Sequence, residues 1–331
     1  MSELRAQSVV AFGGGHGLFA SLSALRLLVD DLTIDDLTAV VTVADNGGSS
    51  GRLRGEFGVL PPGDLRMALA ALCGDDTWDV TWSRVLQHRF AGEGEMRGHV
   101  VGNLLIVSLW ELLGDHVDAL DWIGRLLGAK GRVLPMALTP MVITAEVAGL
   151  LDDPDELVRV RGQVEVAITS GTISSIALEP ADPVICPQAI DAVRAADWMV
   201  LGPGSWFTSV IPHLMIPALR EAIVTSDARL IVVLNLEEQP GETHGLGPGD
   251  HLAALIEHAP DLEPAVVLAD RRCVGDDAAA LEGTVASYGA RLVLADVMVN
   301  DGSPRHDPTK LAAAYAQILG GSSSGGEGDG G

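Results

Sequence analysis

The chain has 331 residues, of which 47% are hydrophobic, so it can bury the core of one large α/β domain or of two smaller ones. Its formal net charge of -24 argues against non-specific binding to nucleic acid or to an anionic membrane surface. Any phosphate site must therefore be local, built from loop amides, helix ends and a few arginines.

Cysteine usage and the N-terminus both indicate an intracellular protein. The three cysteines, Cys73, Cys186 and Cys273, lack metal-ligand spacing and are typical of reduced, packed thiols. No long apolar leader precedes the first apolar run, and no stretch reaches about 18 uninterrupted apolar residues. We therefore expect a soluble, cytoplasmic protein with no membrane insertion and no nucleic-acid partner.

The first third of the chain predicts a strand, a helix and a second strand, with a glycine loop after each strand. The strands are expected at 8–12 and 38–44, and apolar residues at helical spacing cover 18–29. Asp64 is expected to cap a helix that begins at Leu65. Further helices are expected near 78–89, 100–113 and 117–128.

The chain changes character between about residues 131 and 180, where we expect a small β-rich insertion that serves as a lid or an oligomer surface. Short β-branched runs predict its strands at 142–147, 163–168 and 173–178. Alternating strands and helices then resume, with apolar runs at 198–201, 230–234 and 265–268. Residues 320–331 have the composition of a flexible Gly/Ser tail.

This alternation predicts a Rossmann-like α/β fold, in which helices flank a parallel sheet, as a single domain over residues 1–319. The loops that follow the strands then meet at the carboxyl edge of the sheet. Folds of this kind bind their ligands at that edge.

Two glycine loops after strands indicate a nucleotide-like ligand. Glycine lets the backbone approach phosphate oxygens, and the next helix offers free amides and a positive dipole end. The first loop lacks a complete dinucleotide fingerprint, because Leu18 stands where a third glycine would be. The alternative is an ordinary strand-to-helix turn. The candidate residues in these loops are Gly13, Gly14, Gly15, His16, Gly17, Asp45, Asn46, Gly47, Gly48, Ser49 and Arg52.

Two carboxylates near these loops suggest a cation site. In a dinucleotide-binding protein, Asp45 at the end of the second strand would hold ribose hydroxyls. Paired with Asp64, it is instead a candidate ligand for Mg²⁺, a hard cation that prefers oxygen. The alternative for Asp64 is the helix cap described above.

Further candidates follow later strands and open later helices, and each has an ordinary structural alternative. His99 and Asn103 are expected on one face of a helix start. Arg305 is a candidate clamp for a diphosphate. The loop after 198–201 is a candidate anion nest, and the next strand ends in a polar loop. The candidate residues in these two loops are Gly202, Gly204, Ser205, Thr208, Ser209, Asn235 and Thr243.

No catalytic residue is assigned. The sequence contains neither the G-x-S-x-G nucleophile elbow nor the H-E-x-x-H metal motif, and no cysteine lies in a reactive motif. The residues alone therefore indicate a site for a phosphate-sized or nucleotide-sugar-sized ligand without recognisable catalytic machinery.

Seven motifs in a fixed order resemble the YvcK family of bacterial gluconeogenesis factors, in its actinobacterial form, over residues 8–319. The motifs are Gly-Gly-Gly-His-Gly at 13–17, Asp-Asn-Gly-Gly-Ser-Ser-Gly-Arg-Leu-Arg at 45–54, Pro-Pro-Gly-Asp-Leu-Arg at 61–66, Gly-His-Val-Val-Gly-Asn at 98–103, Gly-Pro-Gly-Ser-Trp-Phe-Thr-Ser at 202–209, Gln-Pro-Gly-Glu-Thr at 239–243 and Arg-His-Asp at 305–307.

The resemblance implies a Rossmann-like fold shared with CofD, the 2-phospho-L-lactate transferase of deazaflavin coenzyme synthesis. It also implies a cytoplasmic protein that binds UDP-sugars, notably UDP-N-acetylglucosamine, and is needed for cell shape and wall growth on gluconeogenic carbon sources. Asn235 and Arg305 would then help to hold the ligand. Asn46 departs from the second aspartate of many members, which weakens the case for a metal-dependent transferase.

Three functions therefore stay open. The chain is a UDP-N-acetylglucosamine sensor that signals to cell-wall synthesis proteins, a magnesium-dependent transferase that uses Asp45 and Asp64, or an interaction protein whose insertion binds a partner. We expect a homodimer, the commonest symmetric assembly.

Overall fold

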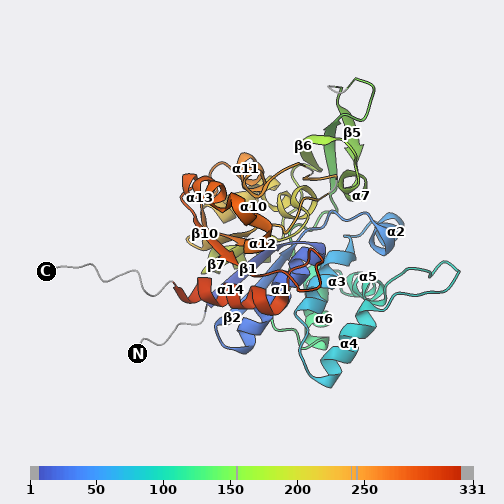
Figure 1. The fold of residues 1–331 in the computed structure, drawn as a ribbon. Coiled ribbons are helices and arrows are strands. Elements are labelled where there is room, and N and C mark those ends of the chain that lie inside the picture. Colours follow the sequence, from blue (N-terminus) through green and yellow to red (C-terminus); the bar gives the residue numbers. More distant parts are fainter. Residues whose placement is uncertain (1–6, 154–155, 240, 244, 322–331) are drawn as a thin grey trace.

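The computed structural model describes residues 7–153, 156–239, 241–243 and 245–321 (Figure 1). Its central sheet has seven strands, all paired in parallel, in the order β10-β9-β8-β7-β1-β2-β3. The Rossmann-like α/β prediction is thereby confirmed. The strands are β1 Gln7–Gly13, β2 Ile34–Val41, β3 Arg132–Pro135, β7 Trp198–Leu201, β8 Arg229–Val233, β9 Pro264–Asp270 and β10 Arg291–Ala295.

Helices pack around this sheet, which explains why its inner strands are continuous apolar runs. Residues 9–12 of β1 are at most 2% exposed, so neither face of the strand meets water. Helix α1 packs against α14 and α3, and Figure 1 shows α1 and α14 lying across the sheet. The described helices, one of them a π-helix (η1) and one a 3₁₀ helix (η2), are α1 Gly15–Asp30, α2 Gly48–Phe57, α3 Pro62–Ala71, α4 Thr77–Gln87, α5 Val101–Leu113, α6 His116–Leu126, α7 Gln163–Ala167, α8 Pro187–Ala195, η1 Trp206–Val210, α9 Pro212–Met215, α10 Pro217–Val224, α11 Pro248–His258, α12 Arg271–Val274, η2 Gly275–Asp277, α13 Ala278–Ser287 and α14 Pro308–Gly320.

The strand order reverses direction at β1. The chain moves from β1 outward through β2 to β3, and it returns to place β7 on the other side of β1. The switch point of the sheet therefore lies between β1 and β7, at the carboxyl ends of these two strands. In open α/β sheets this switch point is where ligands bind.

The insertion forms a second, antiparallel sheet in the order β5-β4-β6, made of β4 Val142–Ala148, β5 Val158–Arg161 and β6 Thr172–Glu179. Figure 1 shows it projecting from the main body beside α7. The expected insertion begins too early at 131, because β3 pairs with β2 in the main sheet.

The strand predicted at 163–168 is wrong. Gly162 adopts a φ of 116°, which ends β5, and residues 163–167 then form the single turn of α7. The β-branched residues of this segment predicted a strand, yet the turn forms because the glycine reverses the chain before it.

Asp64 is not the cap of its helix. Helix α3 begins at Pro62, two residues before Asp64, and no side chain caps it. Proline suits the first helical position because its fixed φ is already helical. Asp64 therefore lies in the first turn, where its carboxylate faces the glycine loops.

The C-terminal part of the chain differs from the sequence prediction in one strand. Strand β10 was not predicted, and most of the predicted tail, residues 322–331, lies outside the described residues. Within the described ranges, none of the helices has both the length and the apolar character that crossing a bilayer requires.

Candidate functional site

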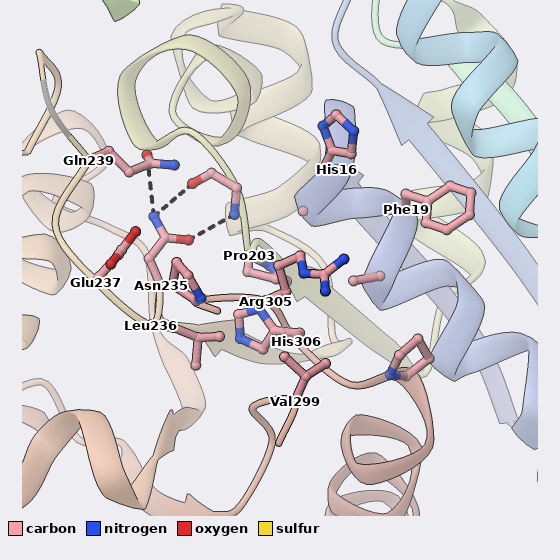
Figure 2. Close-up of a pocket in the computed structure, with 15 residues that line it drawn as sticks. His16, Phe19, Pro203, Asn235, Leu236, Glu237, Gln239, Val299, Arg305 and His306 are labelled. Atoms are coloured by element: carbon pink, nitrogen blue, oxygen red, sulfur yellow. Dashed lines mark hydrogen bonds between the residues drawn. The ribbon is translucent and has the colours of Figure 1, made fainter. Parts of the chain in front are cut away.

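A cavity of about 450 Å³ lies at the switch point of the sheet. His16 and Gly17 reach it from the first turn of α1, Gly204 from the loop after β7, and Asn235 from the loop after β8. The segment between β10 and α14 supplies Arg305 (Figure 2). These residues were all predicted as ligand-binding from sequence, and the fold brings them together.

The close approach of the β1 and β7 loops depends on glycine. A Cβ atom on Gly17 would lie 2.2 Å from the carbonyl oxygen of Pro203, which no real contact tolerates. The loop after β7 also contains Gly202 at φ 77° and Gly204 at φ 143°. Helix α1 can thus bring its first amides, which have no partner within the helix, to the cavity.

Asn235 holds the loop after β7 in place. Its Oδ1 accepts a hydrogen bond from the Gly204 amide at 3.0 Å, and its Nδ2 donates to the Gly204 carbonyl at 2.8 Å. Figure 2 shows this two-bond contact and the neighbouring Gln239, whose Oε1 accepts from the same Nδ2 at 3.5 Å. Because the amide is occupied by these bonds, Asn235 shapes the cavity wall.

The polar groups on the opposite side of the cavity are Arg305 and His306. Arg305 is exposed, and Asp301 and Ser303 orient its guanidinium at 2.7 and 2.8 Å. Burial lowers the pKa of His306 to about 4, and its Nε2 is buried without a hydrogen-bond partner. The cavity therefore offers an exposed cation and a neutral imidazole whose Nε2 has no hydrogen-bond partner.

Asp45 and Asp64 lie on the far side of the first glycine loop. A Cβ on Gly14 would meet Asp64 Oδ2 at 2.6 Å, and a Cβ on Gly63 would meet Asp45 Oδ2 at 2.9 Å. Asp64 is 9% exposed and its Oδ2 has no hydrogen-bond partner. Burial and the nearby Asp45 carboxylate raise the pKa of Asp64 to about 7. Two ionised carboxylates this close together repel each other, and a bound cation would offset that repulsion.

These two carboxylates can serve as ligands for a magnesium ion. Mg²⁺ is commonly bound by one or two carboxylates and keeps several waters. In the part of the chain that the structure describes, no group of three or more His, Cys, Asp or Glu side chains is placed to hold a metal. A cation here would rest on Asp45 and Asp64 alone.

Comparison with known proteins places the chain in a family. Residues 9–302 match the family model described as 2-phospho-L-lactate transferase CofD. A relative from Mycobacterium tuberculosis is 50% identical over 307 residues, which cover 92% of this chain and 88% of the relative. A relative from Listeria innocua named Gluconeogenesis factor is 32% identical and covers 96% of this chain and 98% of its own length. The chain belongs to the CofD-like gluconeogenesis factor family.

A solved structure of the same family has the same fold. A Bacillus halodurans protein, described as a member of the UPF0052 family, superposes with a TM-score of 0.82 at 31% identity. The match covers 93% of this chain and 98% of that one. The resemblance to YvcK-like gluconeogenesis factors, inferred from seven motifs, is confirmed.

Not every motif of the gluconeogenesis factor family reaches the cavity. Ser205, Thr208, Ser209 and Thr243 are absent from its lining. The hydroxyl of Thr208 donates to Glu242 at 2.6 Å, and the hydroxyl of Thr243 accepts from the Gln239 amide at 2.9 Å. The Thr208 contact joins η1 to the loop after β8, and the Thr243 contact lies within that loop. Pro240, in the same motif, lies outside the described residues.

The second glycine loop is likewise built into a polar network. Ser49 Oγ lies 3.1 Å from His99 Nδ1, and Asn103 Oδ1 accepts from Arg66 Nε at 2.9 Å. His99 precedes α5, so it and Asn103 do not share a helical face. Burial, reinforced by Arg52, lowers the pKa of His99. The guanidinium of Arg52 itself donates to backbone carbonyls of the 95–97 segment.

Asn46 links the second glycine loop to the insertion. Its Nδ2 donates to Glu165 Oε2 at 2.8 Å, and its Oδ1 accepts from the Val164 amide at 3.0 Å. Gly47 donates to Asp45 Oδ1 at 2.8 Å, and Gly48, at φ 47°, opens α2. The amide in place of a second aspartate thus has a structural partner in α7.

Sequence reasoning missed the apolar wall of the cavity. Phe19, Leu236 and Val299 line it, together with Glu237. Phe19 lies three residues after His16 on α1, and this i, i+3 spacing is the one signal that points to it. Val299 comes from the segment after the unpredicted β10.

Proposed function

We propose that the switch-point cavity binds a UDP-sugar, with UDP-N-acetylglucosamine as the ligand. We propose further that binding serves cell shape and cell-wall homeostasis during gluconeogenic growth. The observation that supports the ligand is the meeting of the first turn of α1, the glycine loop after β7, an arginine and an apolar wall in one cavity of about 450 Å³. Small-molecule pockets typically measure about 300–1,000 Å³ and combine apolar walls with a few polar groups.

Each part of the ligand has a suitable surface. The backbone at His16 and Gly17, in the first turn of α1, and the Arg305 guanidinium suit a diphosphate. Phe19, Leu236 and Val299 offer apolar contact to a base or a sugar ring. His306 Nε2 is the unused polar atom that a hydroxyl or an imide group would satisfy.

Calorimetric titration tests this proposal. UDP-N-acetylglucosamine is titrated against the protein beside UDP-glucose, GDP and NAD, with and without Mg²⁺. We expect binding of the UDP-sugars and weaker binding of GDP and NAD. No binding of either UDP-sugar would overturn the proposal.

Arg305→Ala assigns the ligand to this cavity. Losing a charge-assisted contact to phosphate should weaken binding by roughly tenfold or more. The fold should persist, because Arg305 pairs with Asp301 on the exposed surface. Arg194→Ala, which removes an exposed arginine of α8 outside the cavity, is the matched control. Equal affinity in the two variants would remove Arg305 from the site.

A second candidate is a magnesium-dependent transferase, and the unpartnered Oδ2 of Asp64 beside Asp45 favours it. Asp45 and Asp64 would hold the ion, which would neutralise phosphate charge. Phosphoryl-type transfer needs positioning and charge neutralisation more than a protein nucleophile. This function requires product formation that depends on Mg²⁺ and is abolished by Asp64→Asn. A stable complex with ligand and Mg²⁺ that yields no product would count against it.

A further inference from the structure

A groove separate from the ligand cavity runs between the insertion and α11. It consists of two adjoining hollows of about 600 and 470 Å³, which share Ile173, Phe207 and Leu246. Neither hollow shares a lining residue with the switch-point cavity. We call this feature the β6 groove, because residues 172–176 of β6 form one wall of it.

The groove follows the outer edge of β6. Four consecutive residues, 173–176, line the same hollow. The pairing with β4 skips Ser174, where a β-bulge interrupts the alternation of side chains, and these four residues all open onto the hollow beside the strand. Among the described strands β6 pairs with β4 alone, so this edge has no strand partner.

Apart from a β-bulge at Ser174 and the terminal Glu179, this edge lacks the residues that usually protect an exposed strand. Proteins blunt exposed edges with charged side chains, with proline or with very short strands. Residues 172–178 of β6 read Thr-Ile-Ser-Ser-Ile-Ala-Leu, without a charge or a proline. The opposite edge of the same sheet, β5, carries Arg159 and Arg161. The two edges thus differ in charge, because arginines lie on β5 and residues 172–178 of β6 are uncharged.

The facing wall is one side of α11. Asp250, Ala253, Ala254 and Glu257 line the groove at i, i+3, i+4 and i+7, which places them on one helical face. The small side chains of Ala253 and Ala254 leave space in the middle of this helical face. An exposed carboxylate, Asp250 or Glu257, lies at each end of it. Phe207 and Leu246 add apolar surface between the walls.

We propose that the β6 groove binds an extended, basic segment of a partner protein, which adds a strand to β6. The open edge supplies backbone hydrogen bonds, and alternate side chains of the segment enter the apolar hollows. Lysine or arginine on the segment pairs with Asp250 and Glu257. The protein's net charge of -24 accelerates the approach of a basic partner and repels an acidic one.

Fluorescence polarisation with defined peptides tests this proposal. The probe is a fluorescein-labelled Lys-Val-Lys-Val-Lys-Val peptide, and the charge control is its Glu-Val counterpart. Two further analogues carry N-methyl groups on every second backbone amide. One is methylated on the odd-numbered residues and the other on the even-numbered residues. Strand addition uses one set of amides, so one analogue should lose binding and the other should keep it. We expect the Glu-Val peptide not to bind.

Charge reversal on α11 locates the binding. Glu257→Lys should weaken the Lys-Val peptide by roughly fivefold or more, whereas Glu282→Lys should leave it unchanged. Glu282 is an exposed acid of α13 outside the groove, so the two variants alter net charge equally. Affinity for UDP-N-acetylglucosamine should be unchanged in both, which keeps this test independent of the proposed ligand.

Three outcomes would overturn the proposal. The first is an absence of Lys-Val binding. The second is equal binding of both N-methyl analogues, or equal weakening in both charge variants, since either would indicate diffuse attraction to an acidic surface. The third is a fall in oligomeric mass of Glu257→Lys in sedimentation equilibrium, which would mean that a second copy of this chain covers the groove.

Discussion

Asp64 shows how a single carboxyl group can make stability depend on pH. Its pKa is raised from 3.8 to about 7, so the folded state holds this proton more tightly than the unfolded state. For an acid raised in this way, the energetic cost of ionisation is absent below the unfolded pKa and fully present above the folded one. Between those values the protein loses stability as the pH rises.

Asp64→Asn should remove this dependence. We expect the stability of the variant relative to the wild type to increase between pH 5 and pH 8, by on the order of 2 kcal/mol. Urea denaturation at several pH values measures the difference. A constant offset across that range would mean that Asp64 ionises as freely in the folded protein as in the unfolded chain.

The effect of Mg²⁺ on stability provides a second test of Asp64. A cation held between Asp45 and Asp64 would favour the ionised carboxyl, so Mg²⁺ at pH 8 should stabilise the wild type and leave Asp64→Asn unaffected. NaCl at the same ionic strength separates specific binding from screening. Equal stabilisation of the two proteins by Mg²⁺ would remove Asp64 from the cation site.

At the scale of elements, the contact between α1 and the loop after β7 depends on one missing side chain. Gly17→Ala would place a Cβ 2.2 Å from the Pro203 carbonyl, a backbone atom that cannot rotate away. We expect a loss of about 1–3 kcal/mol in the free energy of unfolding, because the two elements must move apart. The same movement should weaken ligand binding at the switch point.

Gly55→Ala is the control for Gly17→Ala. Gly55 is exposed within α2, and an added Cβ would meet nothing within 4 Å. Alanine favours helix over glycine, so this variant should be neutral or more stable by up to about 1 kcal/mol. If thermal unfolding ranks Gly17→Ala as equal to Gly55→Ala, the close approach does not hold the site together.

The contact between the second glycine loop and α7 depends on the Asn46 amide. Asn46→Asp removes the Nδ2 donor and faces a carboxylate towards Glu165, so the turn at 163–167 should open more often. Hydrogen exchange of the amides in that turn should become faster. Adding Glu165→Gln restores a donor and should restore protection, and unchanged exchange in the single variant would contradict this account.

These contacts mark where sequence reasoning stops. The loops after the apolar strands, with their glycines and Asn235, carry a local signal, whereas Arg305 was singled out as a guanidinium that precedes the last helix. The structure adds the partners, such as Pro203 opposite Gly17 and Glu165 opposite Asn46, which are distant in sequence. The apolar wall was not predictable, since Phe19 and Val299 resemble any core residue.

At the scale of the whole molecule, the sheet could be predicted but its order could not. Alternating apolar runs and helices specify a parallel sheet, whereas the position of β7 beside β1 is a long-range pairing without a local signal. β10 is the edge strand of the sheet, and its short run after Arg291 is only partly buried. A half-buried edge strand gives a weaker apolar pattern than the inner strands do.

The charge of the whole molecule leads to a last prediction. With 45 acidic and 21 basic residues, the negative charges within one folded molecule repel one another at pH 8. The screening length falls from about 30 Å at 0.01 M salt to about 10 Å at 0.1 M. We expect NaCl added from 0.01 to 0.3 M to raise the melting temperature by roughly 2–6 °C, because compaction then costs less electrostatic energy.

The same titration at pH 5 isolates the cause. Close to the sequence pI of about 4.5 the net charge is small, so repulsion contributes little and the salt effect should shrink. Salt effects that act through hydrophobic burial would persist at both pH values. A gain of equal size at pH 5 would therefore assign the stabilisation to burial, and a melting temperature that does not change with salt at pH 8 would show that the acidic surface is already neutralised locally.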